Sequence, residues 1–398
     1  MVTMLRDKTL WGLIFAVLLM MVGVGMIVVI LPQQVVSLDG NGHSVGYLAS
    51  AFAFSYLLFQ VPIGSLSDKF GFKLFLIIGY LLCFLAGLVF FFATSSGVIF
   101  SARLLQGVGE APVWALAPAL LSVKFPMNKG KVMGIYNAAI HFGLTLGPVL
   151  GLVLAKAKVL TGNAVFLIYS FGCLAGAVVI SLLVEPLTKK EATRTSLVDL
   201  QTILKLIKQR KTCISLLGIT LYGAGYGIFL TTIPTFLLQE KSLSAVAIGL
   251  FFSLFYVAIS ISQIITGSLA DRFGWNILMI LGLLVAVGGI MITPFLSGLL
   301  IFLPLTVASL GMGVFYLASM GFLNEIVPNS LKGTISGAYY LFWGVGMFFG
   351  PPIITKIAAY FSFQAAMTGY SLLMLLVAAG MVKLFGWDRA AGQAKISD

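Results

Sequence analysis

The sequence predicts an all-α membrane protein of twelve transmembrane helices, arranged as two pseudo-symmetric six-helix halves. Three observations carry this prediction. Hydrophobic residues make up 60% of the 398-residue chain and charged residues only 9%, whereas a soluble domain carries about 25% charged residues. The apolar residues form twelve continuous runs, and about 20 such residues suffice to cross a bilayer. The third observation is an internal repeat that spans both halves of the chain.

The apolar runs predict the helices directly. Their continuity, without polar alternation, excludes a transmembrane barrel. The first run, Trp11 to Leu31, is too long for the apolar region of a signal peptide, so we expect it to form the first helix. The expected helices cover residues 9–31, 45–65, 74–94, 99–121, 132–155, 164–184, 213–238, 246–268, 277–296, 300–323, 334–357 and 364–385.

The repeat has a nearly constant offset. Residues 64–73 read GSLSDKFGFK, and residues 267–276, 203 positions later, read GSLADRFGWN. Further pairs keep the offset within one residue: Leu31-Pro32 with Ile233-Pro234, Lys129-Gly130 with Lys332-Gly333, and Gly147-Pro148 with Gly350-Pro351. Duplicated membrane bundles are typical of transporters. We therefore expect an N-terminal half at 1–185, a cytoplasmic linker at 186–212 with an interfacial amphipathic segment, and a C-terminal half at 213–398.

The formal charge of +12 indicates topology and gives no reason to expect a nucleic-acid partner. With the N-terminus in the cytoplasm, 19 of the 24 Lys and Arg residues fall on the cytoplasmic side, as the positive-inside rule requires. We therefore expect a multi-pass protein of the cell inner (plasma) membrane with both termini cytoplasmic. Three cysteines with neither zinc-ligand nor disulfide spacing predict core packing.

The two decapeptides and the glycine pattern of residues 134–151 resemble the major facilitator superfamily, and the resemblance covers essentially the whole chain. Glycine permits close helix approach and tight turns, while the aspartate of each copy can cap a helix or pair with a cation. The resemblance implies a conformational switch at these loops, although the second copy lacks the final basic pair. Its expected residues are Gly64, Asp68, Lys69, Gly71 and Lys73, with Gly267, Asp271, Arg272 and Gly274.

The expected helix 99–121 contains the best candidates for proton coupling. Arg103 and Glu110 are seven residues apart, two turns along one helix face. A carboxylate near the bilayer midplane is costly and usually faces a cavity, and burial destabilises its charged form, which suits a proton carrier. A purely structural Arg–Glu pair is the alternative. His141 either exchanges protons with Glu110 or is a neutral packing histidine.

The expected helix 132–155 matches most of the pattern associated with the antiporter branch of the superfamily, with Leu152 standing where a further glycine is usual. Small residues on one face let a partner helix approach and slide, and a proline can kink the helix. The helix 334–357 carries much of the same pattern, so part of the signal reflects duplication. The residues of this antiporter motif are Gly134, Gly143, Gly147, Pro148 and Gly151.

Aromatic side chains with polar groups suit an amphiphilic guest, although interhelical or lipid-facing packing explains each of them equally well. The candidate substrate contacts are Asn137, Trp114, Tyr222, Tyr226, Tyr339, Tyr340 and Trp343.

The sequence thus predicts a transporter and not an enzyme, with no cofactor and no metal site: it lacks a Walker phosphate loop, zinc-ligand motifs and a nucleophile–base constellation. The expected function is proton-coupled export of small amphiphilic organic molecules by alternating access, and the resemblance implies a monomer. The alternative is a proton symporter that imports an organic anion, with Arg103 holding a carboxylate. A lipid translocase or a non-transporting receptor is a third possibility.

Overall fold

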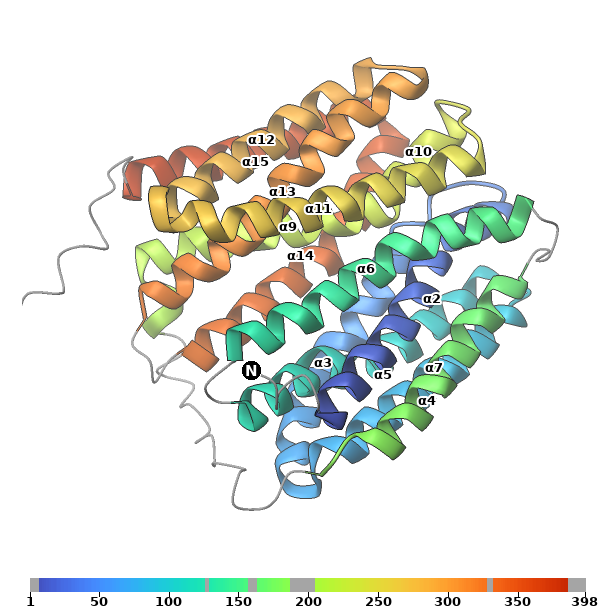
Figure 1. Ribbon diagram of the computed structural model, residues 1–398. Helices are drawn as coiled ribbons and strands as arrows, with labels where there is room; N and C mark the ends of the chain where they lie inside the picture. The colour runs from blue at the N-terminus through green and yellow to red at the C-terminus, as the bar shows by residue number, and fades with distance from the viewer. Residues whose placement is uncertain (1–6, 126–128, 157–162, 187–204, 328–331, 386–398) are drawn as a thin grey trace, which may run out of the picture. The chain divides into compact units, whose positions relative to one another are not determined.

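The computed structural model describes residues 7–125, 129–156, 163–186, 205–327 and 332–385, and all of its secondary structure in these ranges is helical. A helix stands at each of the twelve predicted segments (Figure 1). The first group comprises α2 (Lys8–Asp39), α3 (Tyr47–Phe70), α4 (Phe72–Phe91), α5 (Ser96–Lys124), α6 (Lys129–Lys156) and α7 (Ala164–Leu183). The second group comprises α9 (Arg210–Leu230), α10 (Thr232–Gln239), α11 (Ala245–Phe273), α12 (Trp275–Ile292), α13 (Phe302–Glu325), α14 (Lys332–Tyr360) and α15 (Phe363–Phe385).

The predicted seventh helix is divided in two. The helix breaks at Thr231, and Pro234 sits just inside the new helix α10. Proline has no backbone N–H to donate to the carbonyl four residues earlier and fits best in the first turn of a helix. Its counterpart Pro32 lies within the unbroken helix α2, which runs on to Asp39, beyond the predicted end at residue 31.

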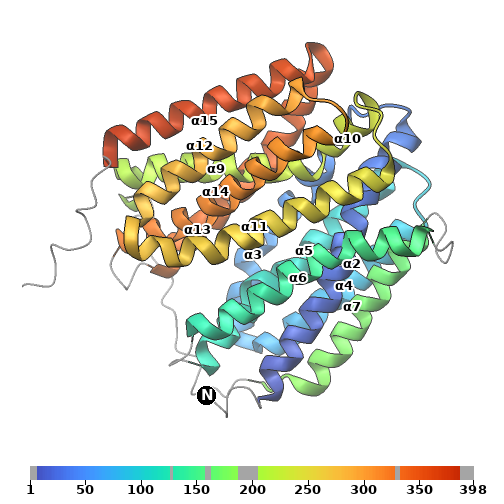
Figure 2. The ribbon, with the colours of Figure 1, turned by 45° about the horizontal axis from the view of Figure 1, so that its top comes forward.

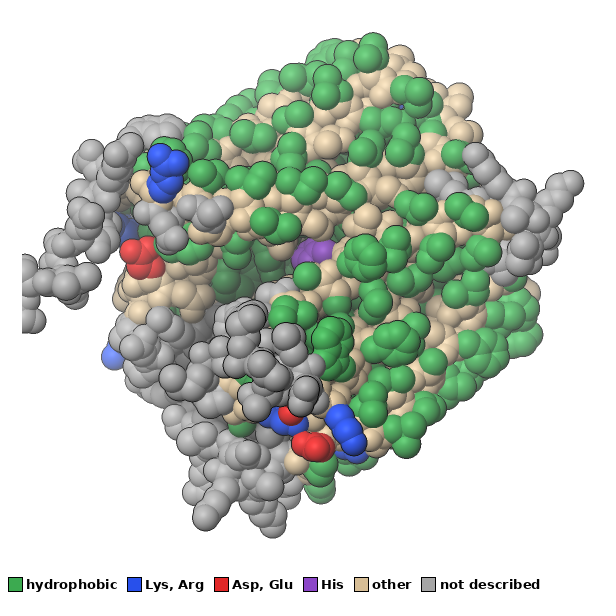
Figure 3. Space-filling model, in the orientation of Figure 1, with side chains coloured by type: hydrophobic (Ala, Val, Ile, Leu, Met, Phe, Trp, Pro, Cys, Tyr) green, Lys and Arg blue, Asp and Glu red, His purple; other side chains and the backbone are tan. Residues whose placement is uncertain are grey.

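Ten of the described helices are long and apolar enough to cross a membrane, and α3 adds a shorter apolar stretch, Tyr47–Gln60. On the face shown in Figure 3, hydrophobic side chains cover the long sides of the helices, and the charged side chains gather near helix ends. A multi-pass membrane protein follows from these helices. The count of twelve spans stays a prediction.

The chain divides into two compact units: residues 1–196 with 244–253, and residues 197–243 with 254–398. Each unit repeats the same helix pairings. In the first, α2 packs against α6 and α7, and α4 packs against α5 and α7; in the second, α9 packs against α14, and α12 packs against α13 and α15. Figures 1 and 2 both show α2 and α6 side by side. The predicted boundaries at 185 and 212 stay predictions, and most of the predicted linker lies outside the described residues.

Glycines explain how closely the first pair approaches. A Cβ atom added at Gly147 of α6 would lie 2.4 Å from the Val22 carbonyl oxygen and 2.7 Å from Gly25 Cα on α2. One added at Gly143 would lie 2.8 Å from Met21 Cβ. Both positions therefore admit only glycine without movement of the α2 backbone. Gly151 differs, because its nearest neighbour, a Met26 side-chain atom, would be 3.9 Å away.

The second unit uses the repeated glycines in the same way. An added Cβ at Gly346 of α14 would lie 1.8 Å from the Thr220 carbonyl oxygen of α9. At Gly350 it would lie 2.3 Å from Ala224 Cβ, also on α9. The duplicated pattern thus corresponds to a duplicated close helix contact, α2 with α6 and α9 with α14.

Candidate functional site

Helix α5 carries a continuous chain of buried polar side chains. Arg103, Gln106 and Glu110 are 5%, 0% and 3% exposed. The Arg103 Nη1 donates to Gln106 Oε1 at 2.9 Å, and Gln106 Nε2 donates to Glu110 Oε1 at 2.8 Å. Trp114 Nε1 donates to the second carboxylate oxygen, Glu110 Oε2, at 3.0 Å. The structure therefore joins three predicted site residues through one that the sequence analysis did not single out.

The spacing of these residues produces the chain. Successive steps of three, four and four residues place all four side chains on one face of an α-helix. The Arg103 end also reaches α3, because its Nε donates to the Leu48 carbonyl oxygen at 3.1 Å and its guanidinium carbon lies 4.9 Å from the centre of the Phe52 ring. A buried positive charge and a buried negative charge are thus linked through a neutral amide, and both have hydrogen-bond partners, as burial demands.

Gln106 is the residue that the sequence analysis missed. A signal was present: an amide in a long apolar helix, three residues after an arginine and four before a glutamate, matches the spacing of helical side-chain pairs. Its two-ended amide can donate to a carboxylate and accept from a guanidinium at the same time, so it separates the two charges while connecting them.

Gln106→Leu is expected to destabilise the protein by about 3 kcal/mol, since breaking a buried charged network costs roughly 3–5 kcal/mol. Thermal unfolding of the purified protein measures the effect. Gln106→Glu, which keeps the acceptor for Arg103 but brings a second carboxyl group beside Glu110, should lose less stability. Equal stability of Gln106→Leu and the parent protein would contradict the bridging role.

His141 of α6, the predicted partner of Glu110, does not belong to this hydrogen-bonded series of side chains. His141 Nδ1 lies 2.9 Å from the Asn137 carbonyl oxygen, one turn earlier on its own helix. The described contacts of the histidine do not include Glu110, and the Asn137 side chain is exposed. Proton exchange between His141 and Glu110 stays a prediction that requires a movement or an intervening group.

The second unit gathers the predicted aromatic residues into one cluster. Tyr222 and Tyr226 of α9 have ring centres 6.2 Å apart, and Tyr226 lies 6.0 Å from Trp343 of α14. Tyr339 and Tyr340 of α14 lie 5.5 Å apart. These separations fall in the range of favourable aromatic pairs.

Tyr316 of α13 connects the two ends of this cluster and was not predicted. Its ring lies 5.7 Å from Tyr222 and 5.9 Å from Tyr339. Tyr222 and Tyr339 are buried, whereas Tyr226, Tyr316, Tyr340 and Trp343 are partly exposed. The partly exposed rings offer apolar faces with polar edges, an arrangement that can hold a flat amphiphilic molecule.

The repeated loops form tight turns. Gly71 and Gly274 have φ of +90° and +81°, in the region that favours glycine. The Lys73 ammonium donates to the Ser181 carbonyl oxygen at 2.8 Å in the last turn of α7, where a cation is stabilised by the helix dipole. An added Cβ at Gly267 would meet nothing within 4 Å, and Arg272 is exposed. The side chains of Asp68, Lys69 and Asp271, and the surroundings of Gly64 and Gly134, lie outside the described part of the chain.

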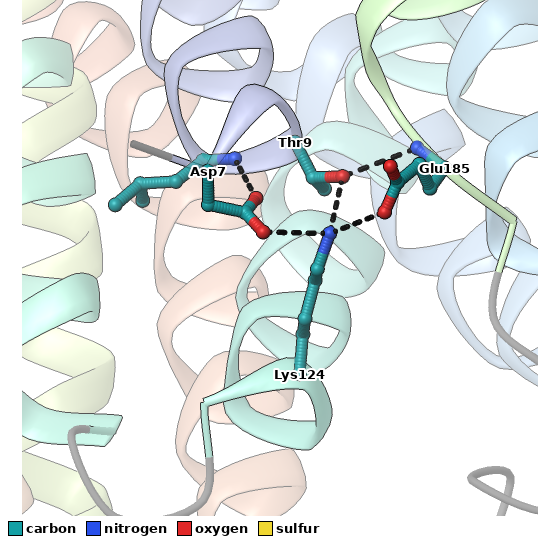
Figure 4. A network of polar contacts seen from close by, with 5 residues as sticks. Asp7, Thr9, Lys124 and Glu185 are labelled. Carbon is teal, nitrogen blue, oxygen red and sulfur yellow. Dashed lines mark hydrogen bonds and ion pairs between the residues drawn. The ribbon is translucent and has the colours of Figure 1, made fainter. Parts of the chain in front are cut away.

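An ion-pair network fixes three helix ends of the first unit (Figure 4). The Lys124 ammonium at the end of α5 lies 3.0 Å from Asp7 Oδ2 and 2.9 Å from Glu185 Oε2, and donates to Thr9 Oγ1 at 2.7 Å. Asp7 also accepts from the backbone N–H of Leu10 at 3.0 Å, which caps α2. The start of α2, the end of α5 and the segment after α7 are thereby held together.

Lys124 should therefore contribute stability that is insensitive to pH across the neutral range. Burial lowers the pKa of Lys124, but the hydrogen bonds and charges of Glu185 and Asp7 outweigh burial and leave it above its ordinary value. A raised pKa means that the contribution is complete below the unfolded-state pKa of lysine and is lost only as pH rises through the folded-state value.

Lys124→Met is expected to lower the free energy of unfolding by about 1 kcal/mol, since its partners are partly exposed. The measurement is thermal unfolding between pH 6 and 9, where the deficit should stay constant. Lys8→Met, which removes an exposed lysine of α2, is the control. A deficit as large in the control would show that charge alone, and not the network, is responsible.

Comparison with known proteins identifies the family to which this helical architecture belongs. The family model described as Major Facilitator Superfamily matches residues 13–351 and, in a second match, residues 215–398. The chain is similar to an uncharacterised MFS-type transporter of Methanocaldococcus jannaschii, with 24% identity over 83% of this chain and 86% of that protein. It is similar to the chromaffin granule amine transporter of Rattus norvegicus, with 26% identity over 80% of this chain and 61% of that protein.

A shorter match and a solved structure complete the comparison. The quinolone resistance protein NorA of Staphylococcus aureus is 29% identical over 38% of this chain and 39% of its own length. The chain thus spans well under two thirds of some relatives that it matches. The crystal structure of a mutant of the nucleoside transporter NupG superposes with a TM-score of 0.80 at 14% identity, covering 95% of this chain and 100% of that one. With its helical fold and the family match over most of its length, this chain belongs to the Major Facilitator Superfamily.

Proposed function

We propose that the protein is a proton-coupled secondary active transporter that exports small amphiphilic organic molecules by alternating access. The observation that carries this proposal is the buried chain Arg103–Gln106–Glu110–Trp114. The Glu110 carboxylate accepts two hydrogen bonds and is buried in a helix long and apolar enough to cross a membrane. Protonation of such a group changes the charge of the protein interior.

Proton binding at Glu110 would act through Arg103. The ionised Glu110 carboxylate balances the Arg103 guanidinium through Gln106, so these three side chains together carry no net charge while Glu110 is deprotonated. Protonation removes the negative charge that Arg103 faces through Gln106, which weakens the electrostatic stabilisation of the buried guanidinium in an apolar interior. A conformation that readmits water to this region then becomes favoured, and the equilibrium between two states shifts.

Alternating access would follow from the duplicated architecture, in which two similar bundles rock about a site near the bilayer midplane. The tight turns at Gly71 and Gly274 lie in the loops that we propose as the conformational switch, with Asp68 and Asp271 as latching groups. The distribution of Lys and Arg supports a plasma-membrane protein with both termini in the cytoplasm, and those loops on the same side.

The aromatic cluster of Tyr222, Tyr226, Tyr316, Tyr340 and Trp343 supports an amphiphilic, aromatic-rich substrate class. Tyr222 is buried, and the partly exposed rings of the other four residues can hold a flat guest through stacking and hydrogen bonding. Export is supported by the resemblance of residues 134–151 on α6 to the antiporter motif and by similarity to proteins named for amine transport and quinolone resistance. Import of an organic anion is less favoured, because Arg103, which would hold the carboxylate, already donates to Gln106 and Leu48.

The test uses the purified protein in liposomes that enclose a pH-sensitive dye. Amphiphilic cations, neutral amphiphiles and organic anions are added outside in turn, with and without a proton gradient. Protons moving opposite to a cationic or neutral amphiphile are expected. Protons moving together with an organic anion would replace the exporter with the symporter, and substrate flux without any proton movement would overturn proton coupling.

A further inference from the structure

A groove of about 230 Å³ lies on the second unit between α11, α12 and α13. Its rim is formed by Ile265, Leu281 and Val285, which are 49%, 39% and 42% exposed. The three helices each meet the length and hydropathy of a membrane span. An exposed apolar rim on helices of this length and hydropathy is more compatible with the hydrocarbon of a bilayer than with water, which favours a groove that opens toward lipid.

The groove is lined by apolar residues, and the few polar groups in its lining already have hydrogen-bond partners. Its polar lining residues, Ser262 and Thr266, donate their hydroxyl protons to the carbonyl oxygens of Ile259 and Ser262 on their own helix, at 2.8 and 2.6 Å. The remaining lining residues are Leu, Ile, Val and Gly. A polar ligand would find no donor that is not already engaged, whereas a hydrocarbon chain would lose nothing by entering.

The floor of the groove is fixed. Gly282 of α12 and Gly311 of α13 line it, and an added Cβ at Gly311 would lie 2.3 Å from the Ala286 backbone nitrogen. The two backbones therefore touch directly and cannot move together to fill the space. A void against packed helices forfeits dispersion contacts, which a flexible acyl chain from the surrounding bilayer can restore.

The basic residue Arg272 lies on α11 beyond one end of this groove. Arg272 is seven residues beyond Ile265 on α11, which places it on the same face about two turns, or roughly 10.5 Å, further along the axis. Arg272 is exposed in the last turn of α11. Trp275, at the start of α12, packs beside Gly321, where an added Cβ would lie 2.5 Å from its ring. Arginine and tryptophan are the residues that mark the headgroup level of a bilayer.

We propose that the groove between α11, α12 and α13 binds one acyl chain of an anionic phospholipid, whose phosphate pairs with Arg272. With the topology proposed above, this lipid belongs to the cytoplasmic leaflet, where anionic lipids concentrate. The site is separate from the buried chain on α5 and from the aromatic cluster. It does not depend on which molecule the protein transports.

Native mass spectrometry of the detergent-solubilised protein tests this proposal, with phosphatidylglycerol or phosphatidylcholine of identical chains added in turn. The parent protein should retain one phosphatidylglycerol that resists removal. Ile265→Trp fills the groove and should lose it, whereas Ile264→Trp, at the neighbouring 76%-exposed position that does not line the groove, should keep it. Equal retention by the two variants would overturn the groove as the acyl-chain site.

The headgroup is tested separately. Arg272→Gln should bind phosphatidylglycerol about fivefold more weakly, the equivalent of roughly 1 kcal/mol for one basic residue near the membrane surface, and should no longer prefer it over phosphatidylcholine. Lys383→Gln, which removes an exposed lysine from the last turn of α15, should keep the preference. Loss of preference in both variants, or in neither, would overturn the pairing with Arg272. Thermal unfolding of each variant without added lipid identifies any misfolded protein, for which milder Ile265→Phe and the uncharged Arg272→Met replace the original pair.

Discussion

Glu110→Gln is expected to abolish proton-driven transport completely while leaving a folded, membrane-inserted protein. The amide cannot ionise, so the carboxylate charge that Arg103 faces through Gln106 is absent in every state. The substitution also replaces one of the two carboxylate oxygens with an amide NH2, a donor that then faces another donor, either Gln106 Nε2 or Trp114 Nε1. The measurement is substrate accumulation in liposomes under an imposed proton gradient, which should fall to the level found without a gradient.

Two comparisons separate lost coupling from lost structure. Exchange of labelled for unlabelled substrate needs no net proton movement and should persist in the Glu110 variant. Glu240→Gln changes an exposed residue that follows α10, and this variant should transport normally. Partial burial raises the pKa of Glu240, and the charge of Lys241 partly offsets this shift. Full proton-driven accumulation by Glu110→Gln would disprove the assignment of Glu110 as the coupling group.

Among the described glycines of the antiporter motif, Gly143, Gly147 and Gly151, Gly147→Ala should be the most destabilising change, by about 1–3 kcal/mol, the usual cost of forcing an extra methyl group into a packed interface. The new Cβ would meet the Val22 carbonyl oxygen at 2.4 Å and Gly25 Cα at 2.7 Å. Both are backbone atoms, which cannot rotate away as a side chain can. Thermal unfolding in detergent provides the measurement.

Gly151→Ala is the matched control, because it adds the same atom on the same helix with its nearest neighbour 3.9 Å away. It should be neutral or slightly stabilising, since alanine favours a helix more than glycine does. The second unit offers an independent pair: Gly346→Ala, at 1.8 Å from the Thr220 carbonyl oxygen, against Gly337→Ala, which meets nothing within 4 Å. Equal stability of Gly147→Ala and Gly151→Ala would refute the close contact between α2 and α6.

The sequence predicted the helices well, because long apolar runs that enter a membrane must satisfy their backbone hydrogen bonds internally, which a helix does. Each apolar run is helical, although the seventh is divided into α9 and α10, and the decapeptide glycines Gly71 and Gly274 lie in turns with positive φ. The same reasoning placed Arg103 and Glu110 on one face of α5. These features depend on local periodicity, on the bilayer thickness and on backbone sterics, all of which can be read from the order of residues.

Contacts between different helices followed only from the folded structure. Tyr316 joins the aromatic rings of α9 and α14, and Lys124 ties together three helix ends. The structure also separates Gly147, which touches backbone, from Gly151, which does not, although both belong to the same predicted motif. Such contacts depend on how each helix is rotated and shifted against its neighbours. That register is set by packing over whole helix surfaces, and a one-dimensional pattern does not contain it.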